Sequence, residues 1–235
     1  MKKVITLVTS SLLVCLSSFL PGNPKTAKLF SPISKYLQSA EKEFDQIPDD
    51  RKTQLRKVAL FVKTKLSAEK KVNLVFICTH NSRRSHMAQL WAYAAAEYYG
   101  VSGVQNFSGG TENTAFNERA VKALTGAGFI ISKKTAGSNP TYEVKYAEGA
   151  PAITAFSKKY MDAPNPSSNF AAIMTCSHAD KNCPTVVGAS VKIAIPYEDP
   201  KEADGKANET TVYNERSRQI AREMLYIFSQ VKSGN

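Results

Sequence analysis

An apolar run that passes directly into a cysteine constrains this chain more than any other feature. The run is VNLVFI, residues 72–77, and Cys78 follows at once. Arg84 and Ser85 come after a five-residue loop, and residues 85–99 have the pattern of a helix. Because a short, continuous apolar run is typical of a strand buried on both faces, the sequence predicts that Cys78 lies at a strand-to-helix turn.

Apolar strands and amphipathic helices alternate along the rest of the chain. Strands are predicted near residues 104–107, 171–175 and 191–195, and helices at 117–127 and 211–230. Alternation of this kind implies a parallel sheet covered on both faces. We therefore expect an α/β fold with a four-stranded, mainly parallel sheet and helices on both faces.

Two segments lie outside this alternation. Between residues 130 and 169, the stretches TYEVKY and AITAFS flank a turn and predict an inserted β-hairpin. Before the first strand, Ser31-Pro32 has the pattern of a capped helix start, and apolar residues recur at helical spacing on both sides of Pro48. A linker and helical extension are expected over 23–71, packed on the main domain.

The first 22 residues have the layout of an export signal. Lys2 and Lys3 precede an apolar or hydroxylated run that ends at Pro21-Gly22. The run is interrupted by serine and threonine, whereas a permanent span needs about 20 mostly apolar residues. The residues favour a cleaved signal peptide and hence an exported, periplasmic protein, with an uncleaved membrane anchor as the alternative.

The positive charge of the chain is concentrated near its start. The net charge is +11, and residues 1–71 hold 14 lysines and arginines against 6 acidic residues. Residues 72–235 hold 17 against 14 and contain no basic motif with interleaved aromatic residues. The charge therefore indicates solvated helix faces, and we expect no nucleic-acid partner.

The loop after Cys78 has the composition of an oxyanion site that holds a nucleophile. A loop between a parallel strand and a helix lies at the sheet edge where ligands bind, and the free amides of the helix start attract anions. Arg84 can bind two oxygens of an oxyanion, and Ser85 can donate to the Cys78 thiolate. The alternative is a buried cysteine beside a surface arginine pair. The expected oxyanion-binding residues are Thr79, His80, Asn81, Ser82, Arg83 and Arg84.

The C-x5-R-S motif resembles that of the low-molecular-weight protein tyrosine phosphatase superfamily. The stretches FSGG (107–110) and YEDP (197–200) are similar to the family's second strand and its acid-bearing loop. The resemblance implies a catalytic domain over 72–235, in which Cys78 is the nucleophile and Asp199 the general acid. An ordinary Asp-Pro turn remains the alternative for Asp199.

A second pair of cysteines resembles the thioredoxin-coupled arsenate reductases of this superfamily. Cys176 and Cys183 lie in MTCSHADKNCP, after the strand predicted at 171–175. The resemblance implies that Cys78 attacks arsenate, Cys176 displaces arsenite, and Cys183 accepts the final disulfide, with an external thiol reductant such as thioredoxin and no tightly bound cofactor. A static disulfide or two buried thiols remain alternatives.

The residues after Asp199 favour arsenate over an aromatic phosphoester. DPKEADG carries no aromatic side chain where the phosphatases of this family stack the substrate ring. The first function predicted is therefore arsenate reductase, and the alternative is a phosphatase that hydrolyses phosphomonoesters through a phosphocysteine. The resemblance also implies a candidate cation site at Asn81, Gln89 and Ser108, in which glutamine replaces a carboxylate; no other metal site is expected.

Overall fold

The computed structural model describes residues 27–182 and 185–232. The expected export signal, Cys15 and Cys183 lie outside the described residues. Within the described ranges, no helix is long and apolar enough to cross a membrane.

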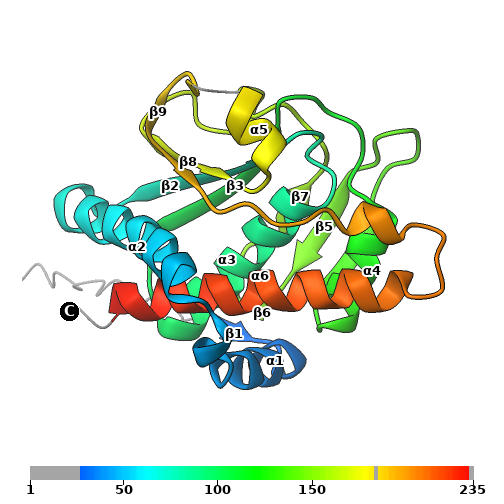
Figure 1. The fold of residues 1–235 in the computed structure, drawn as a ribbon, viewed down its shortest axis with the longest axis horizontal. Coiled ribbons are helices and arrows are strands. Elements are labelled where there is room, and N and C mark those ends of the chain that lie inside the picture. Colours follow the sequence, from blue (N-terminus) through cyan, green and yellow to red (C-terminus); the bar gives the residue numbers. More distant parts are fainter. Residues whose placement is uncertain (1–26, 183–184, 233–235) are drawn as a thin grey trace, which may run out of the picture.

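The centre of the fold is a four-stranded sheet in which every neighbouring pair of strands is parallel (Figure 1). Its order is β3-β2-β8-β9, with bounds Val104–Gly110, Val72–Cys78, Phe170–Met174 and Ala189–Ala194. The predicted fold class is therefore confirmed. All residues of β2 except Asn73 are buried, because the strand is central and both of its faces are covered.

Most helices lie on one face of the sheet. Leu74 and Phe76 of β2 point into a large core on this face, which also contains Trp91 and Phe228. The Trp91 ring stacks on Tyr36 at 4.9 Å. The helices that contribute to this core are α1 (Ser31–Glu41), α2 (Asp49–Glu69), α3 (Arg84–Tyr99), α4 (Glu118–Gly126) and α6 (Glu209–Lys232).

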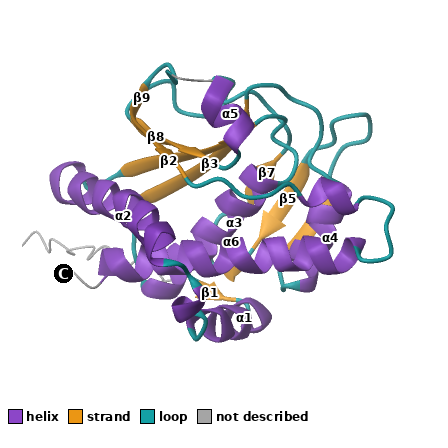
Figure 2. Ribbon diagram, in the orientation of Figure 1, coloured by secondary structure: helices purple, strands orange, loops and turns teal. Residues whose placement is uncertain are grey.

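The opposite face has a smaller cover. Val75 and Ile77 point to this side and pack with Ala179 of the short helix α5 (Ser177–Asn182) and with Val186. Figure 2 shows α5 and several loops on this side of the sheet, away from the long helices. Helices on both faces are thus confirmed, with one short helix and loops on the second face.

The N-terminal extension packs on the main domain, and it forms ion pairs with α6. Arg218 of α6 binds Glu43 at 2.6 Å, and Arg51 of α2 binds the buried Glu223 at 2.7 Å. The capping expectation was wrong, because α1 begins at Ser31 with Phe30 as its N-cap and no side chain caps it. The first helix ends at Glu41, and a 3-10 turn, η1 (Phe44–Gln46), precedes Pro48.

The inserted hairpin is present and belongs to a three-stranded antiparallel sheet. Strand β5 (Tyr142–Lys145) pairs with β7 (Ile153–Ala155), as expected, and also with β4 (Ile130–Lys133). A second small pairing joins β6 (Ala147–Glu148) to β1 (Lys28–Leu29). After β7 the chain returns to the main sheet, where Lys158 O accepts from Gly110 N at 2.9 Å.

Candidate active site

Cys78 is the last residue of β2, and its side chain lies under the loop that leads into α3. The residue is 3% exposed, and its Sγ lies 3.1 Å from Ser85 Oγ. Asn81 Nδ2 donates to the same hydroxyl oxygen at 2.9 Å. Because Ser85 Oγ accepts from Asn81, its own hydrogen is free to point at the sulfur, which stabilises a thiolate.

The loop conformation depends on Asn81 and Gly110. Asn81 is fully buried with φ 44°, a left-handed conformation that asparagine tolerates better than most residues. Its Oδ1 accepts from the Lys158 amide at 2.9 Å. A Cβ at Gly110 would lie 2.6 Å from Thr79 O and 2.8 Å from Asn81 N, so only glycine allows β3 to approach the loop this closely.

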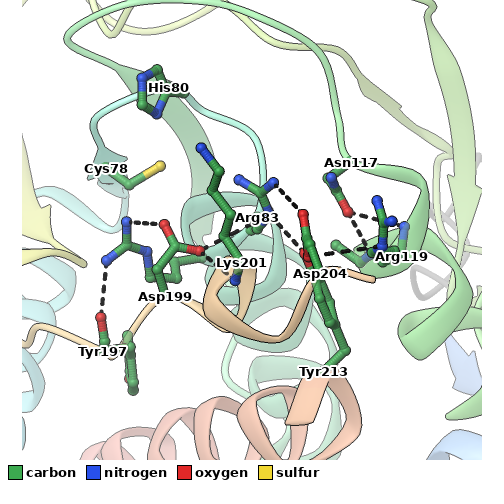
Figure 3. Close-up of polar contacts among 12 residues, drawn as sticks. Cys78, His80, Arg83, Asn117, Arg119, Tyr197, Asp199, Lys201, Asp204 and Tyr213 are labelled. Atoms are coloured by element: carbon green, nitrogen blue, oxygen red, sulfur yellow. Dashed lines mark hydrogen bonds and ion pairs between the residues drawn. The ribbon is translucent and has the colours of Figure 1, made fainter. Parts of the chain in front are cut away.

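Arg84 links the loop to the YEDP segment (Figure 3). Its Nη2 donates to Asp199 Oδ2 at 2.6 Å, and its Nη1 donates to Tyr197 O at 3.0 Å. Asp199 also caps the 3-10 helix η2 (Pro200–Ala203) by accepting from Lys201 N at 3.1 Å. The predicted nucleophile, arginine and acid therefore lie around one site, and Arg84 Nε is buried without a hydrogen-bond partner among the described residues.

Arg83, an expected oxyanion-binding residue, directs its guanidinium to Tyr213 and Asp204. Its Nε donates to Tyr213 Oη at 2.8 Å, and its Nη2 lies 3.4 Å from Asp204 Oδ2 (Figure 3). Arg119 Nε lies 3.7 Å from the same carboxylate. Arg83 Nε also lies 4.0 Å from Asp199 Oδ1, so the side chain of Arg83 braces the loop against both α6 and the YEDP segment.

Cys176 lies beside the first residue of the loop. Its Sγ is 3.5 Å from Thr79 Oγ1, and the same hydroxyl is 3.3 Å from His178 Nδ1. Cys176 is 1% exposed and follows β8, the strand next to β2. Cys78 and Cys176 are both free thiols, and the structure places them at the same edge of the sheet.

The remaining loop residues form the rim of the site. His80 is about half exposed, and its Nε2 lies 3.5 Å from Glu112 Oε2. Ser82 O accepts from Asn117 N at 2.9 Å, which ties the loop to the start of α4. Lys201 extends from η2 toward the part of the loop that holds Cys78 and His80 (Figure 3). The rim thus carries polar and cationic groups.

Two buried titratable residues next to the loop were missed from the sequence. His86 is fully buried, stacks on Phe116 at 4.1 Å and shares a hydrogen bond of 3.2 Å with Ser108 Oγ. Burial lowers the pKa of His86 well below its usual value, and the nearby charge of Lys158 lowers it further. Burial also lowers the pKa of Lys158 to about 8. Lys158 is one of two adjacent lysines in FSKKY (156–160), and such a pair is typical of an exposed segment, so the sequence does not indicate that Lys158 is buried.

The candidate cation site has few free ligands. Asn81 Oδ1 is occupied by the Lys158 amide, and Ser108 Oγ by His86. Gln89 Oε1 is the one oxygen of this set that is buried without a partner. No group of three or more His, Cys, Asp or Glu among the described residues could hold a metal ion. The side chains that are present do not fit a cation well.

Known proteins similar to this chain are arsenate reductases. One from Halalkalibacterium halodurans is 26% identical over 159 residues, which cover 67% of this chain and 94% of the relative. Another, from Bacillus cereus, is 26% identical over 163 residues, which cover 69% of this chain and 98% of the relative. No protein-family model matches the chain.

Solved structures that match part of this chain include a low-molecular-weight phosphotyrosine phosphatase from Vibrio cholerae. It has a TM-score of 0.48 and 13% identity, and covers 70% of this chain and 99% of its own. The predicted resemblance to arsenate reductases is confirmed by these relatives.

Proposed function

We propose that this chain is an arsenate reductase in which Cys78 is the nucleophile and Cys176 the first resolving thiol. The observation that carries the proposal is the free thiol of Cys176, 3.5 Å from Thr79 Oγ1, on the residue next to the nucleophile. A phosphatase needs no second thiol at this place. The relatives named arsenate reductase support the same function, and the prediction that the chain is an enzyme is confirmed by them.

The first step is attack of the Cys78 thiolate on arsenic. Ser85, 3.1 Å from the sulfur, stabilises the thiolate, and the amides of the loop and the start of α3 bind the oxyanion. Arg84 can neutralise the negative charge that develops on the oxygens. Asp199, held by Arg84 at 2.6 Å, is positioned to protonate the leaving oxygen, so that water departs as the sulfur–arsenic bond forms.

The second step transfers two electrons to arsenic. The Cys176 thiolate attacks the Cys78 sulfur, a disulfide forms, and the electron pair of the sulfur–arsenic bond leaves with arsenic as arsenite. Cys183 then attacks Cys176, which releases Cys78 and leaves a Cys176–Cys183 disulfide. An external dithiol of the thioredoxin kind reduces that disulfide and completes the cycle.

The second candidate function is hydrolysis of a phosphomonoester. It is favoured by the Arg84–Asp199 contact, because an arginine and an acid beside Cys78 are all that a phosphocysteine mechanism requires. Water would then attack the phosphocysteine. Against it stands η2, which continues from Pro200 with Lys201 and Glu202 and offers no aromatic ring for a substrate.

A paired assay separates the two functions. For arsenate reductase, we expect arsenate-dependent consumption of NADPH through thioredoxin reductase and thioredoxin, with weak hydrolysis of para-nitrophenyl phosphate. Rapid hydrolysis without arsenate-dependent consumption would favour the phosphatase. If neither activity is found while arsenate, phosphate or sulfate still slow the alkylation of Cys78 by iodoacetamide, the chain is an anion-binding protein without turnover.

We also propose that the enzyme is exported through residues 1–22. The support is the sequence pattern, in which two lysines precede an apolar run. Fractionation of cells that express the chain with and without these residues should shift it between the exported and cytoplasmic pools. Full-length chain in the cytoplasm would contradict export and would give the enzyme access to cytoplasmic thioredoxin.

A further inference from the structure

The thiol of Cys176 has no direct route to lose its proton to solvent. The residue is 1% exposed and packs with Ala179 of α5, whose main-chain N donates to Cys176 Sγ at 3.3 Å. Only a thiolate can attack the Cys78 sulfur efficiently. A group that takes the proton from this buried sulfur would therefore control the second step.

A chain of two contacts connects this sulfur to the surface. Thr79 Oγ1 lies 3.5 Å from Cys176 Sγ and 3.3 Å from His178 Nδ1. Thr79 is 9% exposed, whereas His178 is exposed at the start of α5. A hydroxyl can accept one proton and donate another at the same time, so Thr79 can connect the thiol to the imidazole.

We propose that Thr79 and His178 form a proton relay that deprotonates Cys176, an inference that rests on the proposed function. The Cys176 proton moves to Thr79 Oγ1 as the Thr79 proton moves to His178 Nδ1. The imidazole needs its other hydrogen on Nε2 to accept at Nδ1, and it becomes a cation when it takes up the proton. The amide of Ala179 stabilises the thiolate that remains, and the exposed imidazolium releases its proton to water.

The surroundings of His178 leave its ring available for this role. The nearby acid of α5, Asp180, is paired with Lys192 at 2.9 Å. His80, within the loop, directs its Nε2 to Glu112 Oε2 at 3.5 Å. Asn182 Nδ2 donates to the main-chain oxygen of His178 at 2.8 Å, which fixes the helix but not the ring.

The test measures how fast the Cys78–Cys176 disulfide forms in the Cys183→Ser chain. The reaction is started with arsenate or, independently, with hydrogen peroxide, which converts Cys78 to a sulfenic acid that Cys176 resolves with loss of water. Samples are quenched at intervals, their remaining free thiols are alkylated, and mass spectrometry measures the fraction of chain that carries the Cys78–Cys176 disulfide. Iodoacetamide alkylation of Cys78 in separate samples checks that the nucleophile itself is unchanged.

We expect His178→Gln to slow disulfide formation on the order of 10²-fold with both reagents, while alkylation of Cys78 keeps its rate. Added imidazole should restore the rate in His178→Gly, which a purely structural role would not allow. Thr79→Ser should retain the reaction and Thr79→Val should lose it. Lys181→Gln, on the same helix, is the matched control and should react at the parental rate.

Each other outcome has one meaning. Parental rates in His178→Gln, or a slow His178→Gly that imidazole does not restore, would overturn the relay. If the parent forms the disulfide with peroxide but not with arsenate, and the His178 dependence persists, the relay stands and the proposed function fails. If the parent forms no disulfide with either reagent, the relay is overturned.

Discussion

The two faces of the central sheet are built for different purposes. On one face, Leu74 and Phe76 join a continuous apolar core with five helices. On the other, Val75 and Ile77 pack in a small cluster that contains both described cysteines, under one short helix and loops. Alternation along β2 sends Leu74 and Phe76 to the large core and Val75 and Ile77 to the small cluster. Cys78, at the end of the strand, packs in the small cluster with Cys176, so the reactive edge lies beside the thinner cover.

Because the two faces of the sheet differ in this way, we expect that the reactive thiols can be substituted with little effect on the stability of the fold. The apolar area that stabilises the fold lies mostly in the large core, whereas the second face contributes few large side chains. Substitutions on the two faces should therefore separate activity from stability. Four experiments test this separation, beginning with the largest effect.

Cys78→Ser should abolish every activity and leave the fold intact. The serine hydroxyl has a far higher pKa than a thiol, so it cannot supply the nucleophile, and a loss of roughly 10⁴-fold or more is expected. Thermal unfolding should show a change of about 1 kcal/mol, since the smaller hydroxyl leaves little empty space and keeps Ser85 as a hydrogen-bond partner. A large loss of stability with this variant would mean that the two faces are not independent.

Cys176→Ser and Cys183→Ser should divide the reaction into its steps. With Cys176→Ser, arsenate reduction stops after the first covalent step, while any phosphatase activity persists because water can still attack a phosphocysteine. With Cys183→Ser, about one turnover occurs and a Cys78–Cys176 disulfide remains, since the last exchange is missing. Mass spectrometry of arsenate-treated protein reads both states. Normal arsenate turnover by Cys183→Ser would exclude the three-thiol relay.

Trp91→Ala should lower stability and spare the chemistry. The indole is fully buried, packs edge-on to Phe129 at 4.9 Å and donates to Ser217 Oγ at 3.0 Å. Its removal leaves a cavity and takes one hydrogen-bond donor from Ser217 Oγ, with an expected loss of about 3–5 kcal/mol in the free energy of unfolding. Denaturant titration measures that loss. At a temperature where the variant remains folded, Cys78 should be alkylated at the parental rate.

Lys158→Met should stabilise the protein in a pH-dependent manner. Burial lowers the pKa of Lys158 from 10.5 to about 8 in the folded state, although Asp162 partly opposes this shift. Between these two values the unfolded chain binds more protons, so the stability of the parent rises with pH. The cost of charging the buried amine is therefore complete below pH 8, at about 3 kcal/mol, and absent above 10.5.

At neutral pH, the free energy of unfolding of Lys158→Met should exceed that of the parent by up to the cost of charging the buried amine. Contacts of Lys158 that methionine cannot make reduce this gain. Chemical denaturation at pH 7 and pH 10.5 measures the difference. A gain that is equal at both pH values would show that methionine packing, rather than the removed charge, is responsible.

The strand, loop and helix around Cys78 could be predicted because their signals are local. A buried central strand reads as a continuous apolar run, and β2 is buried along nearly its whole length. The parallel direction of the strands could be predicted because strands and helices alternate along the chain. Strand β3 extends to Gly110 beyond the predicted end, because its last residues pair with Ile77 and Cys78 rather than follow an apolar pattern.

Other parts of the site depend on contacts between distant residues and gave no local signal. Helix α5 is six residues long and mostly polar. It is held on the sheet by Ala179, which packs in the cluster that contains Val75 and Ile77. Lys158 is buried because its amide reaches Asn81, 77 residues away. The cap expected at Ser31 failed because Phe30 N donates to Tyr146 O at 3.1 Å, which ties the preceding residue to the β1–β6 pairing.

The position of α6 also sets the order in which the molecule can be assembled during synthesis. Its ion pairs with the extension join residues 172 to 179 positions apart, and the same helix supplies Ser217 to Trp91. Contacts of such long sequence separation form late and slow the folding of a chain. The extension and the core around α3 therefore stay incomplete until the last helix has left the ribosome, and a chain truncated before residue 209 exposes their apolar surfaces to aggregation.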